Sequence, residues 1–143
     1  MEHCSDVLQG KPSKAKAANY EEWMSDPVEA RLYTESQHSG STGPARGLSK
    51  KIPEILGECR SLLDVGGGSG GFSITLAKQW PELHCTVLDF PNVCAVGRDF
   101  VEKDEMVGRV EFLEGNAVTT PFPADKDAVL MSYISSSVGG EDL

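Results

Sequence analysis

The sequence has no long apolar run: no segment approaches the ~20 consecutive apolar residues that a membrane-spanning helix needs. Its first residues are polar and lack the apolar core of a secretory signal. The four cysteines form no CxxC pair, and none has a histidine at a spacing typical of zinc. These absences predict a cytoplasmic protein with reduced thiols, without membrane contacts and without a bound metal.

Basic side chains are also scarce. The 143 residues include 13 lysines and arginines against 22 aspartates and glutamates, which gives a formal net charge of −9. A protein that binds polyanions normally needs a basic face, so we expect no nucleic-acid partner. Hydrophobic residues make up 39% of the chain, which is enough for one folded domain.

Composition and pattern divide the chain into three parts. Residues 1–18 are polar and are interpreted as a tail. Residues 19–57 have helical patterns and form a lead-in segment, and residues 58–143 form the domain that carries the motifs described below.

The lead-in segment is expected to be helical in two pieces. Asp26 is a candidate N-cap for a helix that starts at Pro27. A polar stretch at residues 37–41 predicts a break, and a second helix is expected over residues 42–55.

After residue 57 the pattern changes to short apolar runs separated by segments of helical length. Strands with little polar character that alternate with helices predict an α/β fold, in which a parallel sheet has helices on both faces. The expected strands are residues 61–65, 83–88, 109–113 and 127–134, with helices over residues 71–80 and from Pro91 onward.

A glycine-rich turn follows the first strand. Gly66, Gly68 and Gly70 satisfy the GxGxG spacing of S-adenosylmethionine sites, while Gly66, Gly68 and Gly71 satisfy the GxGxxG spacing of dinucleotide sites. The glycine spacing therefore fits both cofactors.

Charge distinguishes the two cofactors better. Asp64, two residues before Gly66, would repel a pyrophosphate but would stabilise the cationic sulfonium and amino groups of S-adenosylmethionine. Asp89 closes the second strand, where an acid can accept the ribose hydroxyls, although it could also cap the helix that starts at Pro91. The sequence favours the methyl donor.

Three segments resemble the small-molecule O-methyltransferases of the plant caffeate and hydroxyindole type and their bacterial relatives: residues 62–70 (LLDVGGGSG), 87–91 (VLDFP) and 114–116 (EGN). The resemblance implies a class I Rossmann-like methyltransferase fold with strand order 3-2-1-4 and S-adenosylmethionine as cofactor. It also implies that Gly66 lies against the methionine portion and that Asp89 binds the ribose.

The resemblance implies further cofactor residues. Ser39 follows His38 as in the family's His-Ser segment, where the serine lies near the cofactor carboxylate. Asn116 and Ala117 stand where the family has an acid for the adenine amino group and a larger side chain over the ring, which implies a roomier pocket. Ser132 falls where plant members often carry a lysine at the cofactor site.

The family's general base has no counterpart. Aligning the fourth strand without gaps places Ser136, Ser137 and Val138 on the family's His-Asp-Trp triplet, and a serine hydroxyl is a poor base at neutral pH. We assign no catalytic residue and expect an acceptor that is already nucleophilic. The chain stops just beyond the fourth strand of the family's order, so we expect it to be part of a longer protein, which the resemblance implies is a homodimer.

The sequence therefore predicts an S-adenosylmethionine-dependent methyltransferase acting on a small molecule, with O-methylation by default and C- or N-methylation as alternatives. Two other hypotheses remain. One is a non-catalytic module that keeps the cofactor pocket, and the other is an NAD(P)-dependent oxidoreductase, which Asp64 and Asp89-Phe90-Pro91 disfavour.

Overall fold

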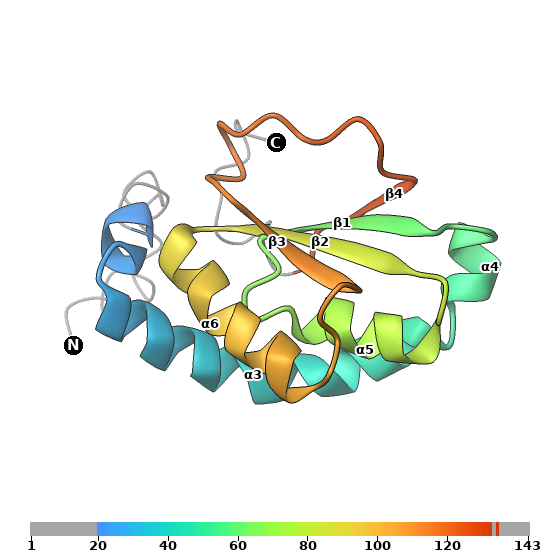
Figure 1. Cartoon of the computed structure of the whole chain (residues 1–143), viewed down its shortest axis with the longest axis horizontal. Coiled ribbons are helices and arrows are strands. Elements are labelled where there is room, and N and C mark those ends of the chain that lie inside the picture. Colours follow the sequence, from blue (N-terminus) through green and yellow to red (C-terminus); the bar gives the residue numbers. More distant parts are fainter. Residues whose placement is uncertain (1–19, 133, 135–143) are drawn as a thin grey trace, which may run out of the picture.

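The computed structural model describes residues 20–132 and 134, which form one parallel four-stranded sheet with helices packed on it (Figure 1). The sheet order is β3-β2-β1-β4, as predicted. The strands are β1 (Ser61–Val65), β2 (His84–Asp89), β3 (Val110–Glu114) and β4 (Ala128–Leu130), and the helices are α3 (Pro27–Ser49), α4 (Ile52–Leu56), α5 (Gly71–Gln79) and α6 (Pro91–Lys103).

Strand alternation sorts the sheet side chains onto two faces. Leu62 pairs with Cys85 and Asp64 pairs with Val87, so these four side chains face the same way. The apolar members of this face pack with Leu76 and other residues of α5 into the main core.

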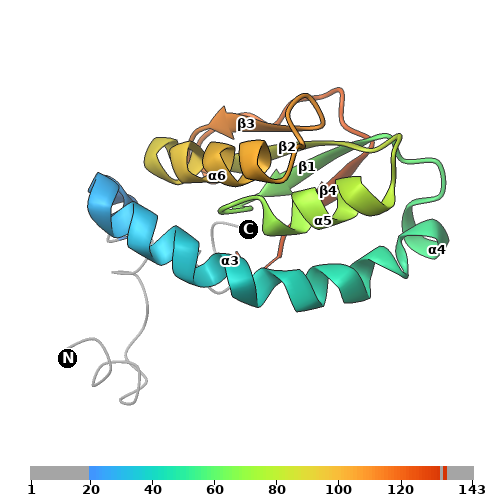
Figure 2. The ribbon, with the colours of Figure 1, turned by 60° about the horizontal axis from the view of Figure 1, so that its bottom comes forward.

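Three of the helices lie on this one face of the sheet (Figures 1 and 2). α5 and α6 pack directly on the strands, and α3 packs on α5 and α6 as an outer layer. The sequence predicts helices on both faces of the sheet. Within the described residues, α3, α5 and α6 cover one face. Residues 115–127 connect β3 to β4 as a coil over the other face, because Pro121 and Pro123 disfavour a helix there.

The predicted break at residues 37–41 is wrong, because α3 continues from Pro27 to Ser49. Its start is as predicted: Oδ1 of Asp26 accepts hydrogen bonds from the backbone N–H groups of Val28 and Glu29, at 2.8 and 3.1 Å. Tertiary packing holds the polar middle in the helix, since the His38 ring stacks on Phe100 of α6 at 3.8 Å between centroids. Weak helix propensity is easily overridden by such packing.

The predicted fourth strand over residues 127–134 is too long. β4 has three residues and pairs with β1 alone among the described strands. Val129 and Met131 are 51% and 47% exposed, so this run is not covered on both faces as its apolar character suggested. No helix of the described residues is both long and apolar enough to cross a membrane.

Arg109 joins the end of α5 to the start of β3. Its guanidinium donates hydrogen bonds to the backbone carbonyls of Ala77, Trp80 and Leu83, at 2.7 to 3.1 Å. Carbonyls at a helix C-terminus lack partners within the helix, so a cation there is stabilising.

We expect Arg109→Ala to lower the free energy of unfolding by about 2–3 kcal/mol, because the variant loses a charged donor and leaves several carbonyls without it. Urea denaturation followed by circular dichroism measures this. Arg46→Ala, at an exposed position of α3, is the matched control and should change stability by less than about 0.5 kcal/mol. Equal effects of the two substitutions would contradict this role for Arg109.

Candidate functional site

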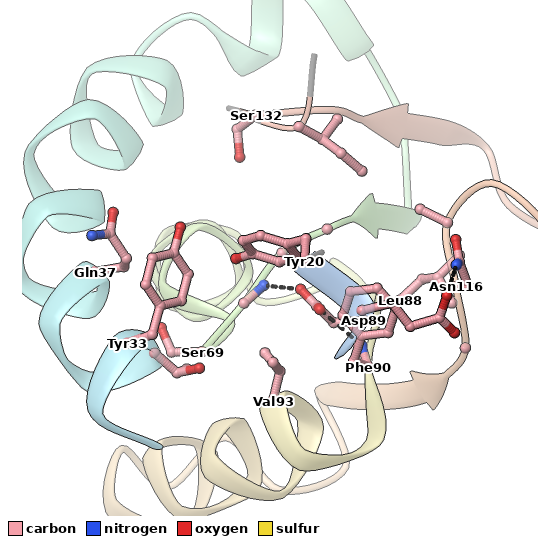
Figure 3. Close-up of a pocket in the computed structure, with 18 of the residues that line it drawn as sticks. Tyr20, Tyr33, Gln37, Ser69, Leu88, Asp89, Phe90, Val93, Asn116 and Ser132 are labelled. Atoms are coloured by element: carbon pink, nitrogen blue, oxygen red, sulfur yellow. Dashed lines mark hydrogen bonds between the residues drawn. The ribbon is translucent and has the colours of Figure 1, made fainter. Parts of the chain in front are cut away.

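A cavity of about 520 Å³ lies at the carboxyl ends of β1, β2 and β3 (Figure 3). Open α/β sheets bind ligands at this edge, and the volume suits a small organic molecule. The lining comes from residues 20–21, one side of α3, residues 66–69, residues 88–90, residues 115–119, Phe72, Val93, Ser132 and Ile134.

The glycine turn has the conformation that its sequence predicts. Gly66, Gly68 and Gly70 have φ angles of 67°, 60° and 78°, in the left-handed region that side chains rarely adopt. A Cβ on Gly67 would lie 2.6 Å from the carboxyl carbon of Asp64. Gly66 and Gly68 line the cavity, whereas Gly70 is the N-cap residue of α5 outside it.

Asp89 connects the glycine turn to β2. One carboxylate oxygen accepts the backbone N–H of Gly68 and the other accepts that of Phe90, each at 2.8 Å. Burial raises the pKa of Asp89, and the two N–H groups oppose that rise. No side chain caps α6, so the alternative role for Asp89 as a cap is not realised. Asp89 lines the cavity, and its contact with a ribose stays a prediction.

Asp64 does not line the cavity, contrary to the expectation that it faces the cofactor's positive charge. It is fully buried on the helix-facing side of β1, where the Ser73 hydroxyl of α5 donates to it at 2.8 Å. Burial raises its pKa to about 6, against the lowering effect of Ser73. Asp64 therefore supports the glycine turn from the helix-facing side of the sheet, where its carboxyl group packs against Gly67.

Ser39 also lies outside the cavity, on an exposed position of α3. Because α3 is continuous, the residues that line the cavity recur at helical spacing: Thr34, Gln37 and Ser41 form one row along the helix, and Tyr33 and Gly40 lie beside it. Ser39 is two residues after Gln37, so its side chain points to the opposite side of the helix from that of Gln37. The predicted break concealed this spacing, which could otherwise have identified the three residues.

Thr34 carries a polar atom that the protein leaves unpaired. Its side chain is 2% exposed, and within the described residues its hydroxyl has no hydrogen-bond partner. A buried polar group without a partner costs stability and is uncommon. Thr34 belongs to the cavity lining, but its hydroxyl oxygen is itself enclosed by the protein.

Aromatic side chains that sequence reasoning did not assign to the site form one wall. The ring of Tyr20 contacts the rings of Tyr33 and Phe90, with centroids 5.7 and 6.1 Å apart, respectively. All three residues line the cavity (Figure 3). Burial and the neighbouring Tyr33 hydroxyl raise the pKa of Tyr20. The spacing of Tyr20 and Met24, four residues apart in the sequence, predicts only an apolar helix face.

Asn116, Ala117 and Ser132 all line the cavity, and their roles at the cofactor stay predictions. The Asn116 side-chain oxygen accepts the N–H of Val118 at 2.9 Å, so this oxygen is already used within the protein. Positions 136–138, aligned with the family's base triplet, lie outside the described residues. Those residues contain no group of three His, Cys, Asp or Glu side chains that could hold a metal ion.

The charge of the lining selects the ligand. It includes the acids Asp89 and Glu21, and no lysine, arginine or histidine among the residues that the structure describes. The N–H of Gly68, which could have bound a phosphate, already donates to Asp89. A parallel sheet with a glycine turn and an acid at the next strand end defines the class of Rossmann-like nucleoside-binding domains, here with a site suited to a cationic ligand.

A family model described as O-methyltransferase domain matches residues 7–137. The chain belongs to this O-methyltransferase domain family.

Two relatives illustrate the range of the family. The 3-hydroxy-5-methyl-1-naphthoate 3-O-methyltransferase of Streptomyces sahachiroi is 38% identical over 94 residues, 66% of this chain and 27% of that protein. The N,N-dimethyltransferase OxyT of Streptomyces rimosus is 27% identical over 115 residues, 80% of this chain and 33% of that protein. The chain thus spans about a third or less of the length of these two relatives.

A solved structure shows the same fold. It is the O-methyltransferase NcsB1 from neocarzinostatin biosynthesis, in complex with S-adenosylmethionine and 2-hydroxy-5-methyl naphthoic acid. The TM-score is 0.70 over 88% of this chain and 39% of that chain, at 22% sequence identity. The class I methyltransferase core predicted from the sequence is confirmed.

The buried carboxyl of Asp64 predicts a pH-dependent stability. Because its pKa is higher in the folded chain than in the unfolded chain, the folded state binds more protons between pH 4 and pH 6 and loses stability as the pH rises. Asp64→Asn removes this loss. We expect the free energy of unfolding of the variant, relative to the unmodified chain, to rise by about 1–2 kcal/mol from pH 5 to pH 8.

Urea titrations at several pH values measure this difference. Asp125→Asn, on the exposed surface, is the matched control for the loss of one carboxylate. A difference between Asp64→Asn and the unmodified chain that falls as the pH rises would contradict the prediction.

Proposed function

We propose that this chain is the cofactor-binding part of an S-adenosylmethionine-dependent methyltransferase that acts on a small-molecule acceptor. The observation that carries the proposal is the acidic cavity, in which Asp89 and the glycine turn lie together without a basic side chain in the described lining. A sulfonium ligand gains from such charge, whereas a dinucleotide diphosphate is repelled.

The residues of the cavity suit this cofactor. Asp89 would accept the ribose hydroxyls, and the turn at Gly66 and Gly68 leaves backbone close to the ligand without side chains in the way. Ala117, which lines the cavity, would lie against the base. When bound, the cofactor supplies an electrophilic methyl group. The chain's contribution is to hold the reactants in line, which accelerates such transfers strongly.

O-methylation is the proposed reaction, because the chain belongs to the O-methyltransferase domain family and the Streptomyces sahachiroi relative is named as an O-methyltransferase. N-methylation is second, since OxyT is named as an N,N-dimethyltransferase. The His38 ring is hydrogen-bonded to the Ser69 hydroxyl at 2.7 Å and stacks on Phe100. Because His38 does not line the cavity, it is not proposed as a base. An acidic phenol, an enolate or an amine fits a site without an assigned base. The predicted homodimer remains part of this proposal.

The test of the cofactor is isothermal titration of the chain with S-adenosylhomocysteine and, separately, with NADH. We expect binding of the first and none of the second. Asp89→Asn should weaken binding at least tenfold, because hydrogen bonds to a charged acceptor contribute about 1.5–3 kcal/mol. Binding of NADH in preference to S-adenosylhomocysteine would overturn the proposal.

Glu114→Gln is the matched control for Asp89→Asn. Glu114 pairs in register with Asp89 and ends the next strand, but it contacts Arg98 at the surface instead of lining the cavity. Its substitution should leave the affinity unchanged. Transfer of a labelled methyl group from S-adenosylmethionine to a panel of phenols and amines then separates an enzyme from a module that only binds the cofactor.

A further inference from the structure

Two polar side chains that are distant in sequence meet at one end of the cavity. Glu21 lies in the helical residues 20–24, and Asn116 follows β3. The Asn116 side-chain amide donates to a Glu21 carboxylate oxygen at 3.0 Å, and both residues line the cavity. This contact joins the helical lead-in to the loop after β3.

The bonding of Asn116 fixes which atoms remain for a ligand. Its amide oxygen accepts the N–H of Val118, and its backbone N–H donates to the Thr120 hydroxyl at 3.0 Å. Its side-chain amino group donates to Glu21. Each of these polar groups of Asn116 therefore has a hydrogen-bond partner within the protein. The charged acceptor at this end of the cavity is the Glu21 carboxylate.

The sheet order indicates which part of the ligand reaches Glu21. The glycine turn follows β1, Asp89 ends β2, and Asn116 follows β3, so these groups succeed one another along one sheet edge. With the ribose at Asp89, a nucleoside base lies toward β3. The exocyclic amino group of adenine carries two N–H donors, which a carboxylate accepts well.

We propose that Glu21, held by Asn116, recognises the amino group of the cofactor's adenine. This proposal rests on the proposed function. An asparagine at position 116 suits the role, because an aspartate there would place two carboxylates about 3 Å apart, where both cannot readily ionise. Glu21 thus supplies the negative charge and Asn116 sets its position.

The experiment compares two ligands by isothermal titration of the full chain: S-adenosylhomocysteine and its 6-oxo analogue S-inosylhomocysteine, in which a carbonyl oxygen replaces the amino group. The unmodified chain should bind the adenine form at least tenfold more tightly, since the analogue turns an acceptor toward the carboxylate. Glu21→Gln should weaken binding of the adenine form about tenfold and reduce the preference, because an amide can also donate to the carbonyl.

An exchange of the two groups tests the pairing itself. Asn116→Asp alone should weaken binding through repulsion. The double variant E21Q/N116D should bind about as tightly as Glu21→Gln alone, because the reversed amide–carboxylate pair removes the repulsion but does not restore the carboxylate at position 21. Glu22→Gln, at the adjacent exposed position outside the lining, is the control and should bind as the unmodified chain does.

The outcomes separate this proposal from the proposed function. No binding of S-adenosylhomocysteine by the unmodified chain would refute both. Normal binding that is unaffected by Glu21→Gln, with an unchanged preference between the two ligands, would refute the role of Glu21 alone. Loss of affinity in E21Q/N116D equal to the sum of the single losses would show that the two residues do not act as a pair.

Discussion

The hydrogen bond from the Gly68 N–H to the Asp89 carboxylate is the contact on which the site depends. It ties the turn after β1 to the end of β2, and it forms only because Gly66, Gly68 and Gly70 adopt left-handed backbone angles. Without this hydrogen bond, the buried Asp89 carboxylate would keep only one of its two backbone partners, the N–H of Phe90, and burying a charge with too few partners is costly. Asp89 thus stabilises the turn and presents its charge to the cavity.

Beneath the turn, a second carboxyl group has a different role. Asp64 fills the space that a side chain at position 67 would occupy, and Ser73 binds it from α5. Asp64 does not line the cavity, so the acidic groups that the described residues present to it are those of Asp89 and Glu21. Of these two aspartates, therefore, Asp64 supports the turn from within the protein, whereas Asp89 faces the cavity.

The long helix α3 lines the site from the outer layer of helices. Its packing on α5 and α6 turns Thr34, Gln37 and Ser41 toward the glycine turn, while residues 20–24 bring Tyr20 and Glu21 over the opposite end. The helical lead-in is therefore part of the pocket. Whether its boundary at residue 58 separates two domains remains a prediction of the sequence.

Local patterns in the sequence determined β1, the cap at Asp26, the glycine turn and the position of Asp89, because each follows from strand alternation, capping chemistry or backbone angles within a few residues. The length of α3, the shortness of β4 and the pairing of Glu21 with Asn116 were decided by tertiary structure. His38 stays helical because it packs on Phe100. Asp64 points away from the cavity and Ser41 replaces Ser39, since the face that a side chain occupies depends on which elements pack against it.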